Sequence, residues 1–352
     1  ATYTVEVTDS NGAKAQATIS IEVLDDASRI SSAFTEQIGE FISRRMERIL
    51  RSEPRRYHLG LRKDKDASGY LNAYANRSLL GTQGGLNFSV NSVSDNGAFF
   101  WAEGYYSIYQ ENRAAGQIDG QFGILHLGGD FSINKDLIVG AMVSFDHSDE
   151  EIDGHSNISG NGWMFGPYFS TRLFDDLYLS GRAAWGHSEN DASIDVYGTG
   201  SSWSGDFSTE RFFSYVSLSG QIEQGIFTFI PEASMGYIRD RQNHYLVSDG
   251  SRNVGVHRQV LELGIAELSA EMQFHFGAAG NSGTLFVRPS ISGEFRKSDY
   301  HGRTSLLTGS LDLGFDSTPS ENLNYGFAIG YDGFGNRDFD GFSLRTYFDF
   351  RF

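Results

Sequence analysis

The chain ends in the stretch GFSLRTYFDFRF, residues 341–352. Counting back from the last residue, every second position but one is a large apolar residue: Phe352, Phe350, Phe348, Thr346, Leu344 and Phe342. Because successive side chains of a β-strand point to opposite faces, the stretch predicts a strand with one apolar and one polar face. Chain ends are usually frayed and polar. The apolar strand pattern that continues to the last residue therefore needs a specific explanation.

The composition suits many strands joined by turns. The 352 residues include 28 Phe, 17 Tyr and 42 Gly but only five Pro. The net charge of -17 and the mean hydropathy of -0.34 are ordinary for a soluble protein. No window approaches the roughly 18 uninterrupted apolar residues of a membrane helix, so any insertion into a membrane must use strands. The acidic balance argues against nucleic acid as a partner, and the absence of Cys excludes a disulfide scaffold and a thiolate zinc site.

Residues 1–26 predict a β-hairpin. Tyr3 and Val5 alternate with polar residues before Asn11-Gly12, and a second alternating run follows that pair. Asn-Gly between two such runs is a strong hairpin signal, although two strands alone cannot bury a core. The chain begins inside this pattern and without Met, so we expect it to belong to a longer or processed protein.

Residues 27–53 change to a helical period. Apolar residues recur three or four positions apart from Ile30 to Ile49, and Pro54 ends the run, so the segment predicts an α-helix. Its last two turns carry a basic cluster: Arg44, Arg45, Arg48 and Arg51. Because so many charges do not suit an apolar core, we expect the helix to have a polar or acidic surrounding. Residues 54–98 are polar, rich in Gly and Asn and without a clear period, and we interpret them as a linker that could contain short strands.

From residue 99 to the end, one strand pattern follows another. Apolar side chains occupy one face of each strand, as at Val139 and Val143, while Gly, Ser or charged residues occupy the other. A charge at every second position excludes strands buried on both faces. We predict twelve antiparallel strands over 99–352, near 99–110, 121–133, 137–147, 160–173, 177–190, 207–223, 226–240, 256–277, 284–297, 303–316, 322–333 and 340–352.

The predicted connections alternate in length. The short ones lie near 134–136, 174–176, 224–225, 278–283 and 317–321. Most of the others are long and polar, among them 148–159, 191–206 and 241–255. Short turns at one rim and long loops at the other are typical of an outer-membrane barrel with its short turns in the periplasm. An even number of strands then places the C-terminus at the periplasmic rim as well.

The number of strands determines whether the apolar face of the barrel points inward or outward. A soluble barrel points its apolar face inward, whereas a membrane barrel points it toward lipid. Eight strands leave an interior that side chains just fill, but twelve open a lumen too wide for Leu and Phe to pack across. The sequence therefore predicts an all-β membrane protein, a twelve-stranded transmembrane β-barrel with a polar lumen. A helix with its side chains is about 10–12 Å across, so we expect the segment 27–53 to thread that lumen.

A helix followed by such a domain and a terminal Phe resembles the translocator domain of the type Va autotransporters, secretion proteins of Gram-negative outer membranes. The resemblance covers roughly residues 27–352 and includes the helix sequence FISRRMERILRSEP, residues 41–54. It implies that the barrel exports the N-terminal part of the chain, the passenger, and that the helix remains as a plug. Residues 1–26 resemble the last two strands of bacterial immunoglobulin-like repeats of surface adhesins, which implies an Ig-like passenger and offers an adhesin as its type.

The resemblance also implies partners and a location. We expect a monomeric barrel in the outer membrane of a Gram-negative bacterium, in contact with its lipid bilayer and lipopolysaccharide, with the passenger at the cell surface. The terminal strand resembles the signal that the barrel assembly machinery reads, carried here by Phe348, Phe350 and Phe352. The alternative is a lipid-facing strand without a signal.

Charge complementarity predicts how the plug is held. We expect the basic cluster to face acidic residues of lumen parity: Glu103, Glu232, Glu267, Glu271, Glu294 and Asp312. Opposite charges attract more strongly in a narrow, low-dielectric channel than in bulk water. The alternative is that these acids pair with arginines of the barrel wall: Arg172, Arg182, Arg288 and Arg345. Both arrangements can hold at once.

The sequence carries little sign of catalysis. Some autotransporters cut their own helix at an Asn-Asn pair, but residues 27–52 contain no Asn. Motifs for a serine nucleophile, a zinc protease or a phosphate loop are absent, and we predict no cofactor and no metal. The acidic segment 147–155 could hold a divalent cation, or it is a solvated loop.

Two alternatives to the translocator remain. A barrel protease or lipid hydrolase would need a cluster at the long-loop rim, for which only four residues are available: Asp146, His147, His187 and His244. A passive porin would show a large, steady conductance, whereas a plugged barrel would show little until the helix is removed.

Overall fold

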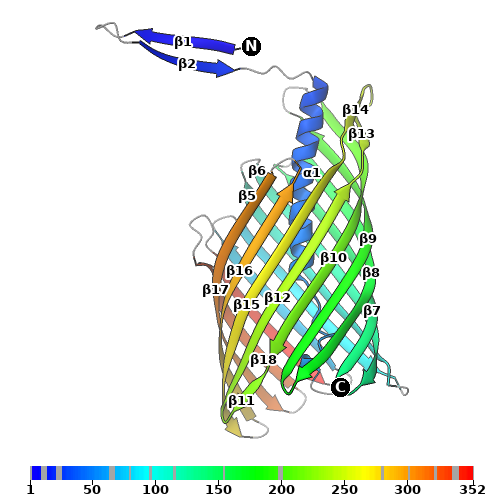
Figure 1. Cartoon of the computed structure of the whole chain (residues 1–352), viewed down its shortest axis with the longest axis vertical. Coiled ribbons are helices and arrows are strands. Elements are labelled where there is room, and N and C mark those ends of the chain that lie inside the picture. Colours follow the sequence, from blue (N-terminus) through cyan, green and yellow to red (C-terminus); the bar gives the residue numbers. More distant parts are fainter. Residues whose placement is uncertain are drawn as a thin grey trace.

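The computed structural model describes residues 2–8, 14–20, 26–62, 68–78, 81–94, 97–113, 116–153, 155–196, 201–278, 281–299, 302–320, 323–334 and 341–351. A single long helix, α1 (Asp26–Arg51), is described, and it matches the predicted helical segment closely. Antiparallel strands make up most of the rest (Figure 1). No described helix is long and apolar enough to cross a membrane.

The strands form a closed barrel in which neighbours along the chain pair with each other and the last strand pairs with the first. The barrel strands are β3 (Ser68–Ser78), β4 (Gly81–Val93), β5 (Phe99–Arg113), β6 (Gly116–Asn134), β7 (Leu137–Ile152), β8 (Ser156–Phe174), β9 (Leu177–Asp195), β10 (Ser202–Gly220), β11 (Ile222–Gln224), β12 (Phe227–Gln242), β13 (Tyr245–Ser248), β14 (Asn253–Val256), β15 (Gln259–Ala278), β16 (Asn281–Ser298), β17 (Gly302–Ser320), β18 (Leu323–Phe334) and β19 (Gly341–Arg351).

The predicted strand number requires a correction. The twelve long strands expected over 99–352 are all present, but β3 and β4 add two more, so fourteen long strands close the barrel. The segment 54–98 is therefore not a linker throughout, because β3 pairs with β19 along its whole length. Without that pairing, β19 would present unpaired backbone groups to lipid, which is costly. In β3 the outward residues Ala73 and Ala75 are small and weaken the alternation, whereas β4 does alternate, with Leu86, Phe88 and Val90 on its outer face.

The long polar connections predicted at one rim are largely strand. β7 runs on to Ile152 and β8 starts at Ser156, so most of the predicted loop 148–159 is paired wall. The same holds between β9 and β10, which pair up to Asp195 and Ser202. At the opposite rim the turns are short, as between β6 and β7. The wall is therefore much taller on this side of the barrel than a bilayer alone requires.

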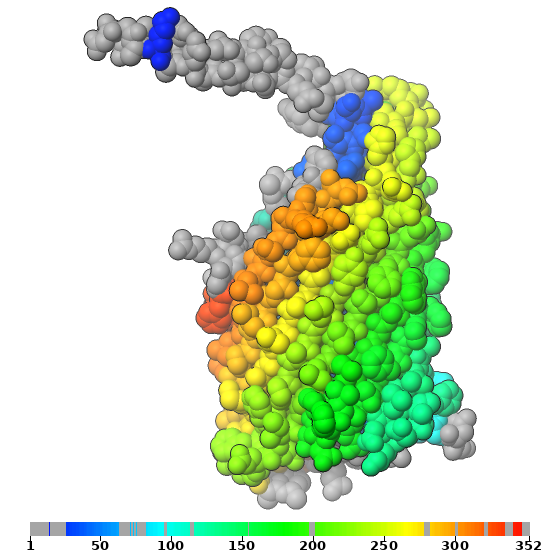
Figure 2. Space-filling model, in the orientation of Figure 1, coloured from blue at the N-terminus to red at the C-terminus, as the bar shows by residue number. Residues whose placement is uncertain are grey.

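The apolar face points outward, as predicted. Phe145, Phe165 and Ile329 are about half exposed on the outer surface, whereas their lumen-facing neighbours Ser144 and Ala328 are buried. A soluble protein does not expose so continuous an apolar surface. The closed outer wall is visible in Figure 2, with α1 emerging at the upper rim. This surface is suited to lipid.

The outward face permits a direct test at Phe169. Its side chain lies midway between Trp163 and Leu173, which share the outer face of β8. The substitution Phe169→Arg is expected to lower the free energy of unfolding by about 2–4 kcal/mol, since it places a charge in the apolar band. Denaturant unfolding in lipid vesicles measures the change. Phe169→Leu is the control, with an expected loss under about 1.5 kcal/mol; equal losses for both variants would show that the face does not meet lipid.

The N-terminal segment forms a separate two-stranded sheet. β1 (Thr2–Thr8) pairs with β2 (Lys14–Ser20) in an antiparallel register that matches Val5 with Ala17. The two strands agree with the predicted hairpin, while its Asn11-Gly12 turn lies outside the described residues. No pairing joins this sheet to the barrel among the described strands.

Candidate functional site

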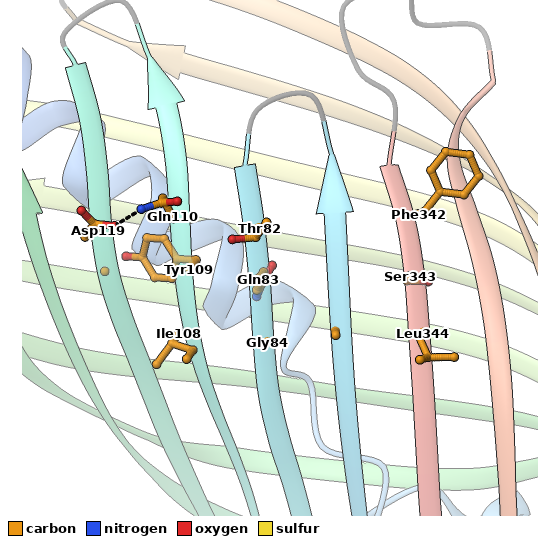
Figure 3. Close-up of a pocket in the computed structure, with 12 residues that line it drawn as sticks. Thr82, Gln83, Gly84, Ile108, Tyr109, Gln110, Asp119, Phe342, Ser343 and Leu344 are labelled. Carbon is orange, nitrogen blue, oxygen red and sulfur yellow. Dashed lines mark hydrogen bonds between the residues drawn. The ribbon is translucent and has the colours of Figure 1, made fainter.

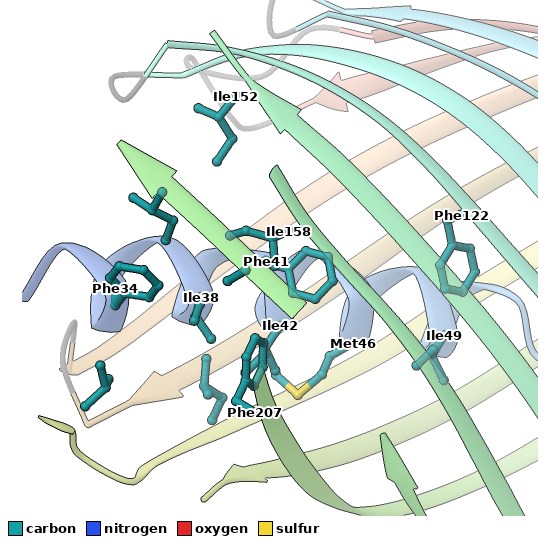
Figure 4. Close-up of a cluster of buried hydrophobic side chains, with 14 of the residues drawn as sticks. Phe34, Ile38, Phe41, Ile42, Met46, Ile49, Phe122, Ile152, Ile158 and Phe207 are labelled. Carbon is teal, nitrogen blue, oxygen red and sulfur yellow. The ribbon is translucent and has the colours of Figure 1, made fainter. Parts of the chain in front are cut away.

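The helix α1 lies inside the barrel lumen, with its C-terminal end toward the short-turn rim that also holds the end of β19 (Figure 1). Its apolar stripe is completely buried: Ile30, Phe34, Ile38, Phe41, Ile42, Met46 and Ile49. Figure 4 shows these side chains against an apolar patch of the wall that includes Phe122, Ile158 and Phe207. The expectation of a wholly polar or acidic surrounding is therefore wrong for this side of the helix, because one side of the lumen is itself apolar.

Arg44 is locked to the wall by Glu150 on β7. Its Nε donates to both carboxylate oxygens, at 3.0 and 3.1 Å, and its Nη2 donates to Oε2 at 2.5 Å. Tyr109 on β5 adds a hydroxyl hydrogen bond of 2.7 Å to the same carboxylate. Both charged side chains are almost fully buried, at 6 and 1 % exposure. A buried pair with two-pronged geometry is directional and resists exchange with water.

Arg45 occupies a second buried site one residue further along. Its Nε lies 2.6 Å from Oδ1 of Asp146, and its Nη1 donates to Asn190 at 2.7 Å. Asp146 also accepts a bond of 3.0 Å from Arg211 of β10. Two glycines of β8 make room for the guanidinium, because a Cβ at Gly160 or Gly162 would lie under 3 Å from its terminal nitrogens.

The other two arginines of the cluster make looser contacts. Arg48 lies 3.0 Å from Glu111 of β5 and stacks over the Tyr109 ring at 3.4 Å. Arg51 is half-exposed, pairs with Glu47 of the helix at 2.9 Å and approaches Glu294 of β16 at 3.7 Å. Arg48 and Glu111 are still largely buried, at 10 and 18 % exposure, so the partly solvated pairs of Arg51 hold the helix least firmly.

Of the predicted acids in the described residues, Glu294 forms an ion pair with the basic cluster, and Glu267 lines the same lumen cavity as Arg48 and Arg51. Asp312 pairs with Arg288 at 2.9 Å and with Arg345 at 2.6 Å, and Glu271 lies 4.0 Å from Arg288, which is the predicted wall network. Glu103 accepts hydrogen bonds from the backbone of residues 55 and 56. Among the described residues, Glu232 and Glu267 form no ion pair with the four arginines.

Sequence analysis missed the acids that hold the helix most tightly. Glu150 falls in the predicted connection 148–159, and Asp146 is considered only for a rim cluster, so neither is predicted to meet the basic cluster. The signal was the continued alternation of Asp146, Ser148 and Glu150, all buried on the lumen side of β7. A strand that extends beyond the bilayer still has two faces. The polar residues that were interpreted as a loop therefore belong to a strand of the barrel wall.

The segment after the helix occupies one side of the short-turn end of the lumen, against β6, β8 and β9. Glu53 pairs with Arg182 of β9 at 3.0 Å, with both side chains nearly buried. Arg62 donates two hydrogen bonds, of 2.8 and 2.6 Å, to the carboxylate of Asp130 on β6. Between them, the 3-10 turn η1 (Leu59–Leu61) donates from its first backbone N–H to Ser170. Residues 53–62 are therefore part of the plug and not a free linker.

The proposed rim cluster for an enzyme is not assembled. Asp146 faces the lumen in its pair with Arg45, whereas His147 is exposed on the outer face, where it bonds to Asn161. Since neighbouring residues of a strand point apart, the part of the acidic segment that lies in β7, residues 147–152, is likewise divided between two faces. Among the described residues, no group of three or more His, Asp and Glu side chains is arranged to hold a metal ion.

The outer surface carries a shallow pocket at the β3–β4 hairpin (Figure 3). Ala75 and Gly84 leave a gap of about 800 Å³ between Ile108 of β5 and Leu344 of β19. The gap reflects the small outward residues of the two strands that close the barrel. Its lining includes outward residues such as Ile108 and also Tyr109, the lumen-facing ring over which Arg48 of the helix stacks.

The positions of the terminal aromatic residues are described only in part. The backbones of Phe348 and Phe350 are paired on both sides, with Tyr325 and Leu323 of β18 and with β3. Phe352 lies outside the described residues. The assignment of these residues as an assembly signal stays a prediction.

Comparison with known proteins bears directly on this architecture. The chain matches the family model "Autotransporter beta-domain" over residues 100–312. No curated protein matches. The translocator domain of the autotransporter NalP from Neisseria meningitidis shares 13 % identity, with 92 % of this chain and 98 % of that chain covered and a TM-score of 0.50.

Two further solved barrels are similar. The β domain of the Bordetella autotransporter BrkA shares 15 % identity over 82 % of this chain and 100 % of that chain, with a TM-score of 0.46. The Pseudomonas putida toluene transporter TodX shares 10 % identity over 81 % of this chain and 89 % of that chain, with a TM-score of 0.52. At such identities a structural likeness shows the fold alone, and the family rests on the sequence match. The chain belongs to the autotransporter β-domain family and is an outer-membrane translocator domain of type V secretion from a Gram-negative bacterium.

Proposed function

We propose that the barrel exports an N-terminal passenger and then anchors it at the cell surface, with α1 as the tether and stationary plug. The observation that carries this proposal is the double lock of Arg44 with Glu150 and Arg45 with Asp146. The direction of the helix supports it, because the passenger side of α1 lies at the rim opposite the short turns. The apolar stripe adds a contact that release of the helix would expose to water.

The hairpin β1–β2 supports an immunoglobulin-like passenger. Its register and alternation fit the last two strands of such a repeat, and a repeat of that kind suits an adhesin. The passenger stays attached or is cut by another protease, since residues 27–52 contain no Asn for self-cleavage. The domain acts by holding and positioning the chain and performs no catalysis.

The remaining partners follow from the outer-membrane location. The barrel assembly machinery reads the terminal strand through Phe348, Phe350 and Phe352, and the taller wall contacts lipopolysaccharide. The barrel works as a monomer, because its closed sheet has no free edge for a second copy.

Surface display tests export and anchoring. The chain is expressed behind a signal peptide with an epitope tag before residue 1, and intact cells are treated with a protease. The tag is expected to be removed while the barrel stays in the outer membrane. A tag that becomes accessible only after the cells are broken would contradict the proposal.

Charge exchange tests the lock. Arg44→Glu opposes Glu150 across a buried contact, so the conductance of the purified barrel in planar bilayers is expected to rise severalfold as the helix loosens. The double variant Arg44→Glu/Glu150→Arg is expected to bring the conductance back toward its original value. Arg29→Glu, in the first turn of the same helix, is the control without effect. If Arg44→Glu leaves the conductance unchanged, Arg44 does not hold the plug.

A further inference from the structure

The helix does not fill the lumen. Its apolar stripe is pressed against one side of the wall, while Glu40, Glu47 and Arg51 on its other side face an open space of about 1120 Å³. The strands β15 to β17 line most of the far side of this space, through residues such as Ser292 and Ser310. The lumen is thus packed on one side of the helix, while on the other side a polar space remains, crossed by an ion pair of 2.6 Å between Glu47 and Arg296 of β16.

The strand number explains this polar space. Barrel diameter grows roughly in proportion to the number of strands, and a helix with its side chains is only about 10–12 Å across. The two strands β3 and β4 widen the barrel without adding bulk to the plug. The helix therefore packs against one side of the lumen, and its apolar stripe packs against the apolar part of the wall.

Charged side chains face the lumen between the cavity and the short-turn rim. Below the cavity, lumen-facing charged side chains remain partly exposed, with 20 % for Glu271 and 30 % for Arg345. Glu271 of β15 pairs with Ile230, which is the fourth residue of β12, a strand that starts at that rim. On the opposite side of the lumen, Tyr57 and His58 of the segment after the helix are buried. The lower plug therefore closes one side and leaves the other accessible.

We propose that the barrel, with its helix in place, passes small hydrophilic solutes and ions through a lateral channel beside the helix, and that this channel prefers cations. Acidic residues outnumber basic ones around the cavity, eight to six. Like-signed excess charge in a channel with low-dielectric walls raises the local concentration of counter-ions. The inference rests on the proposed role of α1 as a plug that stays docked.

The chain offers a clean probe, because it has no native Cys. The full chain is placed in planar bilayers, and Ser292→Cys and Ser310→Cys variants are treated with a positively charged, water-soluble methanethiosulfonate reagent. The reagent is expected to modify both positions and to lower the conductance in steps. Ser148→Cys is the matched control: Ser148 also faces the lumen but is buried beneath the helix at 1 % exposure, so it is expected to react far more slowly.

Ion preference is read from the reversal potential in a KCl gradient, which is expected to lie on the potassium side of zero. A reversal potential on the chloride side would overturn the preference for cations. A full chain without conductance, or one whose conductance is unaffected by complete modification at 292 and 310, would overturn the lateral channel. Equal reaction rates at 148 and 292 would show instead that the helix is not docked, so that the plug itself is wrong.

Discussion

Replacing Asp146 with alanine is expected to lower the free energy of unfolding by about 3–5 kcal/mol, the cost of removing one partner from a buried ion pair. The carboxylate is completely buried and serves two arginines, Arg45 of the helix and Arg211 of the wall. Arg211 retains Asp240 as a partner at 2.9 Å, but Arg45 keeps only the neutral Asn190. The loss therefore falls mainly on the attachment of the helix.

Guanidinium unfolding followed by fluorescence of the four Trp residues measures this change in detergent micelles. Asp149→Ala is the matched control, because it removes the same side chain from the same strand on the outward face. Its effect is expected to stay within about 0.5 kcal/mol. A loss below about 1 kcal/mol for Asp146→Ala would mean that the pair with Arg45 contributes little to docking.

Phe41→Ala is expected to weaken the docking of α1 by about 3–5 kcal/mol. The ring is fully buried between the helix and the apolar wall. Its removal loses transfer free energy and leaves a cavity that a rigid barrel wall cannot close. The effect should be local to the helix, since the wall keeps all its strand pairing.

Amide hydrogen exchange detects this loss in the intact protein, because exchange reports local opening. Helix amides of the Phe41→Ala variant are expected to exchange about 100-fold faster or more, at 1.4 kcal/mol for each factor of ten. Amides of the central wall strands should keep their rates. Glu36→Ala, at an exposed position of the same helix, is the control with little effect. Unchanged helix protection in the Phe41→Ala variant would contradict a docked apolar stripe.

Most of the fold could be predicted because strand faces are local. A residue such as Val139 or Phe327 points to one side of its strand, whatever lies around it, and the alternation showed all twelve strands over 99–352. The exception was the pair β3 and β4: small outward residues such as Ala75 left little contrast in β3, and the alternating run Leu86, Phe88 and Val90 of β4 was included in the predicted linker that could contain short strands. Closure of the sheet, which a local pattern does not contain, brought both strands into the wall.

The sequence was enough to predict that a basic cluster on the helix would meet acidic residues of the lumen, but it identified only some of those acidic residues. The basic cluster was visible in the sequence, and Arg51 does approach Glu294. Its tightest partners, Glu150 and Asp146, come from a strand about a hundred residues away. The tilt and stagger of the strands determine which residues of β7 lie beside a given turn of α1. The alternation within a single strand contains no information about either.

The sequence by itself determined the period of each segment, the apolar and polar face of each long strand, and the basic end of the helix, since these depend on backbone geometry within a few residues. Only the tertiary structure decided the width of the barrel, the side of the lumen on which α1 packs and the acids that hold it. These depend on how fourteen long strands close around one helix, and the contacts join residues whose separation along the chain carries no local signal.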